Sequence, residues 1–476
     1  MMHRLATIAC LFALFAATQA LAEVDRTWRA VLFDGRKVGH ALTEREVMGG
    51  GEVRTAEIMS LEIQRDGVSV SMSSLEETTE SDAGEPLSFR AEIKTAGQTL
   101  SYRGTRQTDG TFKVAIDGAG SARVQTLKLP PFAKFFEAQR AALSTALKDG
   151  TSLLAIDAFV PSQLETVPLE TSFKGRRRVE LMQSEEQLME IEQVVRFASG
   201  PMQVNAFVTD DFDAQRIRMD LLGMKIELLA CDEACATAPN QPLDFLDRLV
   251  LDAPRALSKT DLAQPLRYTL RIDGTDLQPA QTNHQSVASE GDDGRIEIVV
   301  DPAARGSGEI DPIYTLPSAW VQSDSVILQD LAKRAAGKAT EPAEKMANAE
   351  AFVREYIFGK TLSVGYASAL EVATSRQGDC TEHALLLTGI ARALGIPARV
   401  ATGLAYVPSF GDREDVFVPH AWTEAFIDGR WVGFDAALSG FDSGHLALAV
   451  GDGDPVRYFA GVALLGSLKI EALQAP

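Results

Sequence analysis

The chain has little positive charge, few cysteines, and no long apolar segment beyond its first residues. Its 476 residues include 46 lysines and arginines against 66 aspartates and glutamates, which gives a net charge of −20. A surface of this sign repels phosphate backbones, so we expect no nucleic-acid partner. The one basic run, at residues 174–180, is interpreted as a solvated strand edge. After residue 23 no segment reaches about eighteen uninterrupted apolar residues, which predicts no stable membrane insertion.

The first 22 residues have the pattern of a secretory signal. Arg4 precedes an apolar run from Leu5 to Ala17, and the small residues Ala20 and Ala22 precede Glu23. The run is too short to remain as a membrane-spanning helix. We therefore expect residues 1–22 to be removed and the mature protein to be periplasmic or secreted.

Cysteine is scarce, with four residues in the whole chain. Cys10 lies in the expected signal, which leaves Cys231, Cys235 and Cys380. Cys231 and Cys235 form either a short disulfide or half of a metal site. No histidine is close in sequence and two sulfurs cannot complete a zinc shell, so we favour the disulfide, although so short a loop can strain it. Either reading leaves Cys380 as the odd thiol of an exported protein, and such a thiol is a candidate reactive group. We expect no metal and no cofactor.

Period-2 alternation dominates the N-terminal half of the chain. Asp-Gly pairs at 34–35 and 66–67 separate alternating segments, which predicts an antiparallel meander. A helix is expected to interrupt it between Pro131 and Gly150. The predicted organisation is a signal peptide at 1–22, a β-rich domain at 23–245, a small β segment at 246–318, an α+β domain at 319–450 and a C-terminal extension at 451–476.

Apolar residues spaced three and four apart mark two amphipathic helices near the start of the predicted α+β domain. The first begins near Asp324 and the second ends near residue 360. Their expected buried stripes are Leu328, Leu331 and Ala335, and then Met346, Ala349, Val353 and Ile357.

The octet RQGDCTEH, residues 376–383, places Cys380 where a loop turns into a helix. Asp379 is the expected N-cap, and Glu382 completes a capping box. Gly395 and Pro397 end the helix. The amide groups and dipole of a first helical turn favour a thiolate. The alternative is that Cys380 is a small buried apolar residue, but its position and odd number favour a nucleophile.

A thiolate nucleophile needs a base that can return the proton to the leaving group. Five histidines follow the expected signal. We expect no ordered chemistry around His40 and His284 in the β-rich part and no evident partner for His445. His383 is interpreted as packing at the helix surface, which leaves His420 as the candidate base.

His420 opens the segment HAWTEAFIDGRWVGFDAA, in which Asp428-Gly429 predicts a two-residue hairpin turn. Such a turn places Phe426 opposite Trp431 and Trp422 opposite Asp435. His420 and Asp435 then become diagonal neighbours about 7–8 Å apart at the backbone. A carboxylate there can fix the imidazole tautomer. The alternative is an ordinary hairpin with a surface histidine, and Glu424 on the same strand face is the second candidate carboxylate.

The segments GDCTEHALLLTGIARALGIPARV and HAWTEAFIDGRWVGFDAA resemble the core of the transglutaminase-like superfamily. The resemblance extends over about residues 325–450, with 40 residues from Cys380 to His420 and 15 from His420 to Asp435. It implies a papain-like α+β domain that follows the β-rich N-terminal region, a layout similar to that of secreted bacterial members. Cys380 then corresponds to the nucleophile, His420 to the general base and acid, and Asp435 to the orienting carboxylate.

The oxyanion site and the substrate slot are less well defined by the resemblance. The backbone amide of Cys380 is one expected donor, and Tyr366 is the candidate for the second, with Gln377 as the alternative. Pro419 stands where the family has glycine or an aromatic residue, which concerns the shape of the slot. The acidic loop with Asp412, Glu414 and Asp415 lacks the register of a calcium loop and is interpreted as solvated.

The resemblance implies acyl transfer at an amide of a protein or peptide through a thioester. Resolution by water gives a protease or amidase, and resolution by an amine gives a crosslinking transglutaminase. We favour hydrolysis for an exported protein. A non-enzymatic binding role for the β-rich region is the remaining alternative, and the oligomeric state is left open.

Overall fold

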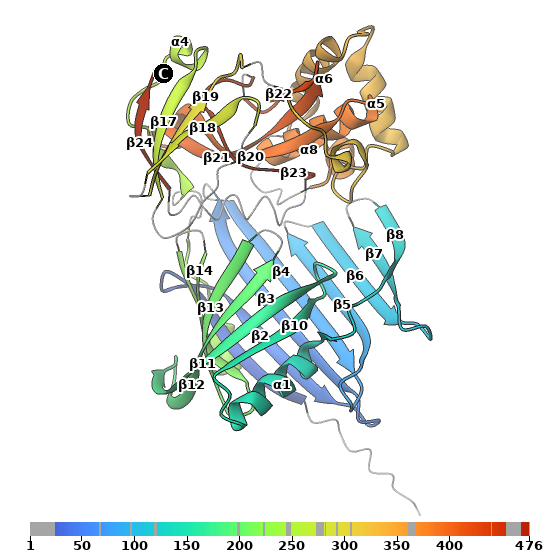
Figure 1. Ribbon diagram of the computed structural model, residues 1–476, viewed down its shortest axis with the longest axis vertical. Coiled ribbons are helices and arrows are strands. Elements are labelled where there is room, and N and C mark those ends of the chain that lie inside the picture. Colours follow the sequence, from blue (N-terminus) through green and yellow to red (C-terminus); the bar gives the residue numbers. More distant parts are fainter. Residues whose placement is uncertain are drawn as a thin grey trace, which may run out of the picture.

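The chain folds as an α+β protein with a large β-rich N-terminal region and a C-terminal domain of helices and strands (Figure 1), as the sequence predicts. The computed structural model describes residues 24–475 except 66–67, 96–97, 119–120, 198–199, 222–223, 244–248, 273–279, 281, 292–293, 305–306, 360–366, 439 and 454–467. The expected signal peptide and the turn at 66–67 lie outside the described residues.

A 15-stranded sheet makes up the N-terminal region, in the order β8 to β1 followed by β15 to β9. Neighbouring strands are antiparallel except for the β9–β10 pair. The turn between β1 and β2 has positive φ at Asp34 and Gly35, as a primed hairpin turn requires. The strands are β1 Val24–Phe33, β2 Arg36–Val47, β3 Val53–Arg65, β4 Val68–Glu80, β5 Pro86–Thr95, β6 Gln98–Arg106, β7 Phe112–Gly118, β8 Ser121–Leu127, β9 Ala133–Lys134, β10 Leu153–Val160, β11 Glu165–Glu180, β12 Glu185–Phe197, β13 Gly200–Val208, β14 Ala214–Leu221 and β15 Met224–Ala230.

One helix, α1 (Phe136–Lys148), interrupts the meander and begins five residues after Pro131. The N-cap residue, Phe135, makes no side-chain hydrogen bond to the first backbone amides of the helix. The carboxylate of Glu80, at the end of β4, accepts hydrogen bonds from the backbone N–H of Glu137 at 2.7 Å and of Ala138 at 2.9 Å. The helix therefore starts where a distant strand supplies the acceptor for its unpaired amides.

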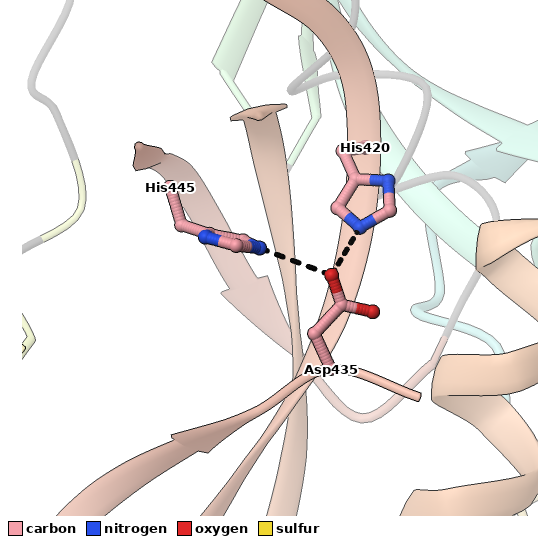
Figure 2. Close-up of side chains that lie close together, drawn as sticks. All are labelled: His420, Asp435 and His445. Carbon is pink, nitrogen blue, oxygen red and sulfur yellow. Dashed lines mark hydrogen bonds and ion pairs between the residues drawn. The ribbon is translucent and has the colours of Figure 1, made fainter. Parts of the chain in front are cut away.

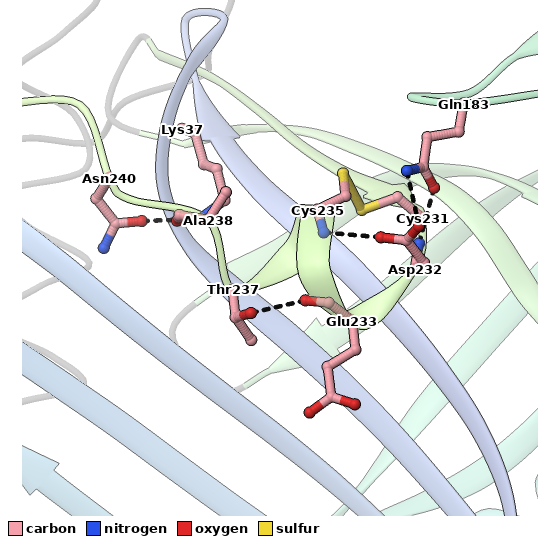
Figure 3. The surroundings of a disulfide bond; sticks show 9 residues. All are labelled: Lys37, Gln183, Cys231, Asp232, Glu233, Cys235, Thr237, Ala238 and Asn240. Atoms are coloured by element: carbon pink, nitrogen blue, oxygen red, sulfur yellow. Dashed lines mark hydrogen bonds between the residues drawn. A yellow bond between two sulfur atoms is a disulfide. The ribbon is translucent and has the colours of Figure 1, made fainter.

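Cys231 and Cys235 are joined by a disulfide that links the residue after β15 to the short helix α2 (Glu233–Ala236), in which Cys235 lies (Figure 3). Asp232 caps this helix, because its carboxylate accepts the backbone N–H of Cys235 at 2.8 Å. Gln183 donates its side-chain amide to the same carboxylate at 2.9 Å. The bridge thus closes one turn of chain after the last strand of the sheet.

We expect the intact mass of the exported protein to rise by two hydrogens on reduction, because Cys231 and Cys235 are bridged. Replacing both by serine is expected to lower the free energy of unfolding by at most about 2 kcal/mol, since so short a loop removes little entropy from the unfolded chain. Mass spectrometry before and after reduction checks the first statement and denaturant titration the second. An unchanged mass would contradict the bridge.

A four-stranded sheet in the order β18-β19-β17-β24 follows the β-rich region. Three of its strands come from the predicted small β segment: β17 Leu266–Ile272, β18 Gln285–Glu290 and β19 Arg295–Val300. The fourth, β24 (Leu468–Gln474), comes from the predicted C-terminal extension and pairs antiparallel with β17. The extension is therefore an integral strand of this sheet.

The C-terminal domain combines helices with a five-stranded sheet ordered β16-β21-β20-β23, with β22 paired to β21. Residues of the expected helical stripes, from Leu328 to Val353, are buried against α8, and so is Ile357, just after its helix. The remaining elements are β16 Leu251–Asp252, α4 Lys259–Leu262, η1 Pro312–Thr315, α5 Val326–Ala336, α6 Pro342–Tyr356, α7 Ala369–Ser375, α8 Cys380–Ala393, β20 Ala398–Phe410, β21 Arg413–Ile427, β22 Arg430–Phe434 and β23 His445–Gly451.

One apolar core connects the three sheets. It contains Val31 and Phe33 of β1, Tyr268 of β17, Phe417 of β21 and Leu446 of β23, all buried. The C-terminal domain therefore rests on the β-rich region, as the two halves of Figure 1 show. Within the described part of the chain, no helix is long and apolar enough to cross a membrane.

Candidate active site

Helix α8 begins at Cys380, and its start is capped as the sequence predicts. The carboxylate of Asp379 accepts the backbone N–H of Thr381 at 3.0 Å, and the carboxylate of Glu382 accepts the backbone N–H of Asp379 at 2.9 Å. These reciprocal bonds fix the first turn of the helix. The half-buried Cys380 is therefore held at a point where the helix dipole favours an anion.

Glu382 is fully buried under this turn and also accepts the backbone N–H of Ala367 at 2.9 Å. Burial, followed by the neighbouring Asp379, raises the pKa of Glu382 well above its usual value. Gly378 makes room for the Glu382 side chain, because a Cβ at Gly378, where φ is +149°, would lie 2.2 Å from the Cβ of Glu382.

His383 is buried, so its interpretation as a helix-surface residue is wrong. Its Nδ1 lies 2.6 Å from the backbone carbonyl of Asp379 and must donate to it, because a carbonyl only accepts. The helix is enclosed on nearly all sides, and residues from Thr381 to Arg392 are buried along it. The ring of His383 therefore stabilises the start of α8.

Helix α8 packs against β21 next to His420. The hydroxyl of Thr423 donates to the carbonyl of Ala384 at 2.9 Å, and the same hydroxyl lies 3.1 Å from that of Thr388. Ala384 also belongs to the same buried apolar cluster as Ala421, the neighbour of His420. These contacts place the first turns of α8 beside the part of β21 that carries His420.

The hairpin of β21 and β22 has the predicted register, with Phe426 opposite Trp431 and Thr423 opposite Phe434. Asp428 and Gly429 both have positive φ, as a type I′ turn requires. The ladder ends at Phe434, so Asp435 is not paired with Trp422 as expected. The chain instead leaves the sheet at Asp435.

His420 and Asp435 are buried and hydrogen-bonded to each other (Figure 2). The Nε2 of His420 lies 2.8 Å from Oδ2 of Asp435. The other carboxylate oxygen, Oδ1, accepts the backbone N–H of Ala437 at 2.8 Å and of Leu438 at 3.1 Å. Burial alone would raise the pKa of Asp435, but the charges and hydrogen bonds of the neighbouring histidines hold it well below its usual range. Asp435 is therefore ionised and fixes the orientation of the His420 ring.

Residues 329–436 match the family model of the transglutaminase-like superfamily. This segment contains Cys380, His420 and Asp435. It is a transglutaminase-like domain.

Similar solved structures have low sequence identity to the chain. A candidate cysteine protease from Cytophaga hutchinsonii is 21% identical, with a TM-score of 0.30, over 44% of this chain and 87% of that one. A β-barrel-like DUF1849 domain protein from Brucella abortus is 13% identical, with a TM-score of 0.36, over 44% and 97%. A candidate protease from Parabacteroides distasonis is 11% identical, with a TM-score of 0.18, over 73% and 68%. No curated protein matches the chain.

Helix α6 of the transglutaminase-like domain holds the backbone of Asp435. Glu350 accepts the backbone N–H of Asp435 at 2.8 Å, and Arg354 donates to its backbone carbonyl at 2.9 Å. The two helix residues lie 3.8 Å apart as an ion pair. Sequence reasoning missed both, because they look like ordinary residues of an amphipathic helix.

His445 was expected to lack a partner, and that expectation is wrong. It is buried at the start of β23, and its Nε2 lies 3.0 Å from Oδ2 of Asp435, the atom that also binds His420 (Figure 2). Its Nδ1 lies 3.0 Å from Oδ1 of Asp442. The one local signal is an aspartate three residues before the histidine.

His284 also has ordered surroundings, contrary to expectation. It is buried, and its Nε2 accepts the backbone N–H of Gly433 in β22 at 2.9 Å. Its ring packs on Phe441 with 4.8 Å between centroids. Burial lowers the pKa of His284, so a neutral ring supports the hairpin from outside the His420–Asp435 pair.

Glu424, the second candidate carboxylate, binds Arg399 instead of His420. Its Oε2 accepts from Nη2 of Arg399 at 2.7 Å and from Nε at 2.8 Å. The arginine also lies over the ring of Trp431, with 4.1 Å from Cζ to the ring centroid. Glu424 therefore forms a buried ion pair with Arg399.

Among the described residues, His420, Asp435 and His445 form the one group of three or more histidine, cysteine, aspartate or glutamate side chains whose possible metal-ligating atoms lie within 4.8 Å of one another. The two Nε2 atoms lie 2.8 Å and 3.0 Å from a single carboxylate oxygen. Such distances fit donors that point at an acceptor, whereas ligands share a metal at about 2.0–2.2 Å each. The arrangement is that of two hydrogen bonds to Asp435.

Of the two residues expected to supply the second oxyanion donor, Gln377 is among the described residues and Tyr366 is not. Tyr366 lies outside the described residues, and the alternative, Gln377, is exposed. The backbone of Gln377 forms an isolated bridge with Gly359, which ties the segment before Cys380 to the end of α6. Pro419 lies within β21 opposite Leu404.

Proposed function

We propose that the chain is a cysteine-dependent hydrolase of peptide or protein amides that works through a Cys380–His420–Asp435 triad. The observation that carries this proposal is the buried hydrogen bond between His420 and an ionised Asp435, on the strand against which the Cys380 helix packs. A histidine oriented by a carboxylate beside a thiol at a helix start is the arrangement that activates a cysteine. The transglutaminase-like domain supports this class of chemistry.

The proposed reaction has two steps. The Cys380 thiolate attacks the amide carbonyl, the C–N bond breaks, and the His420 imidazolium gives its proton to the departing amine or ammonia. This leaves a thioester on Cys380. Water then attacks the thioester while His420 takes its proton, the C–S bond breaks, and the acid is released together with the original thiolate–imidazolium pair.

Asp435 has a defined part in both steps. Because its carboxylate accepts from Nε2 of His420, the other ring nitrogen, Nδ1, is the one left to exchange a proton with Cys380. The backbone amide of Cys380, at the start of α8, is the proposed oxyanion donor. We further propose that the protein acts outside the cytoplasm, because of its signal-like N-terminus.

We expect Cys380 to be the rapidly alkylated thiol of the native protein. Labelling with iodoacetamide should persist below pH 7, because the helix start and His420 both stabilise the thiolate. Peptide mapping after labelling at several pH values measures this, and the Cys380→Ala variant should lose the label. A labelling midpoint near about 8.5, as for an ordinary cysteine, would contradict the proposal.

Incubation with fluorescent casein and a fluorescent primary amine separates the two ways of resolving the thioester. New peptide N-termini or free ammonia that depend on Cys380 support hydrolysis. Incorporation of the amine into casein without these products would overturn hydrolysis in favour of transamidation. If the wild type and Cys380→Ala behave alike in every product, the proposed catalytic role of Cys380 is wrong.

A further inference from the structure

His445 contacts Asp435 but is not a member of the proposed triad. It is buried between two carboxylates, with Nε2 3.0 Å from Asp435 and Nδ1 3.0 Å from Asp442. Carboxylates accept hydrogen bonds and do not donate them when ionised, so a ring that binds both must carry a proton on each nitrogen. The backbone N–H of Asp442 also points at Nδ1, at 3.2 Å, a contact that only an unprotonated nitrogen could accept; the shorter distance to the carboxylate favours the ring with a proton on Nδ1.

We propose that His445 is a positioning residue that stays protonated and shares Oδ2 of Asp435 with His420, so that it partly neutralises the carboxylate and weakens its hold on the His420 proton. This inference rests on the proposed function, because it deepens the role of the same site. The geometry carries it: one oxygen atom accepts from two imidazoles at 2.8 Å and 3.0 Å.

The protonation of His445 has a clear electrostatic cause. Burial on its own lowers its pKa, but the hydrogen bonds and charges of Asp435 and Asp442 outweigh this and raise the pKa of His445 to about 9. The other charged groups at this point come from α6. Glu350 and Arg354 both bind the backbone of Asp435, and burial raises the pKa of Glu350.

A cationic His445 changes how readily His420 gives up its proton. The two rings lie 5.7 Å apart between centroids, so a charge on one opposes a charge on the other. The repulsion is strong at this separation, because both rings are buried away from water. Asp435 compensates part of it. His420 therefore becomes a better acid towards a departing amine than a histidine that has a carboxylate to itself.

Nitrogen NMR of histidine-labelled protein tests the first half of the inference without any change at His445. In the Cys380→Ala background, which removes thiol coupling, both ring nitrogens of His445 should show imidazolium shifts at pH 7. A neutral His445 ring at that pH would overturn the inference. Asp442→Asn, which keeps an acceptor oxygen but removes its charge, should lower the pH at which His445 loses its proton.

His445→Gln tests the second half, because glutamine can still donate to Asp435 but carries no charge. We expect the His420 ring to keep its proton to a higher pH in this variant than in the wild type, because the neighbouring positive charge is gone. His284→Gln is the matched control, since His284 supports the same hairpin and does not touch Asp435. It should leave the His420 titration unchanged. An unchanged titration in His445→Gln would overturn the inference.

Protein stability provides a third readout with a definite sign. The folded-state pKa of His445, about 9, is above its ordinary value of 6.5. Its contribution to stability is therefore fully present below pH 6.5 and is lost as the pH rises through about 9. The stability deficit of His445→Gln should shrink over that range, and a deficit that does not depend on pH would count against a charged His445.

These measurements separate the inference from the proposed function. The NMR titrations do not require turnover, so they can succeed even if no amide substrate is cleaved. Conversely, a reactive Cys380 together with a neutral His445 would leave the triad in place and remove only the role assigned to the second histidine.

Discussion

Replacing Asp435 by asparagine will lower the rate of casein hydrolysis by about 10²–10⁴, because an amide cannot replace the carboxylate in either of its two tasks. Oδ1 accepts two backbone N–H groups and Oδ2 accepts two imidazoles. The NH₂ group of asparagine must therefore point either at the backbone N–H groups or at the histidines, and both are donors. If it points at His420, it donates to Nε2, so the ring proton moves to Nδ1, the nitrogen that should exchange a proton with Cys380.

Asp428→Asn is the matched control on the same hairpin. Asp428 is in the turn with φ +50°, a conformation that asparagine adopts as readily as aspartate. The control should retain wild-type activity and stability. Initial rates must be divided by the folded fraction from circular dichroism, because losing acceptors for buried donors costs about 1–3 kcal/mol. Wild-type turnover by folded Asp435→Asn would show that Asp435 does not orient the base.

Replacing Glu424 by alanine is expected to lower the free energy of unfolding by about 3–5 kcal/mol, because it leaves a buried arginine without its counter-charge. The side chains of Arg399 and Glu424 are 10% and 1% exposed, and the guanidinium is fixed above Trp431. Water therefore has little access to the guanidinium of Arg399 once Glu424 is removed. Urea titration followed by tryptophan fluorescence measures the loss.

Two further variants show whether the effect comes from burial. Asp211→Ala removes a comparable ion pair with Lys148, whose side chains are 74% and 58% exposed, and should change stability by less than about 0.5 kcal/mol. The double replacement of Arg399 by methionine and Glu424 by leucine should recover much of the stability, since it removes both charges. A cost below about 1 kcal/mol for Glu424→Ala would mean that water reaches Arg399.

The sequence predicts those parts of the site that local rules control. The Asp428–Gly429 turn fixes the register of its hairpin, and this brings His420 and Asp435 to the same end of it. The capping box of Asp379 and Glu382 likewise depends on only four consecutive residues. Such features depend on neighbours in the chain, so they can be read without knowing the fold.

Features set by distant pairings could not be predicted. His445 reaches Asp435 because β23 pairs with β20, with Ala405 opposite His445, and no local pattern shows that pairing. The start of α1 depends on Glu80, which lies 57 residues before Glu137. The burial of His383 follows from the enclosure of α8 on nearly all sides, which its apolar stripe alone does not show.

The pairing of β24 with β17 has a consequence for the order in which the protein can assemble. Tyr268 of β17 donates its hydroxyl to the carbonyl of Ser443 at 2.5 Å, next to the loop that leads into His445. Strand β17 lacks one of its two neighbours until Leu468–Gln474, a segment far later in the chain, has paired with it. Contacts between such distant segments form slowly because a long loop must close first. The support behind His445 therefore depends on a slow, long-range pairing, so we expect the surroundings of this histidine to become ordered late in folding.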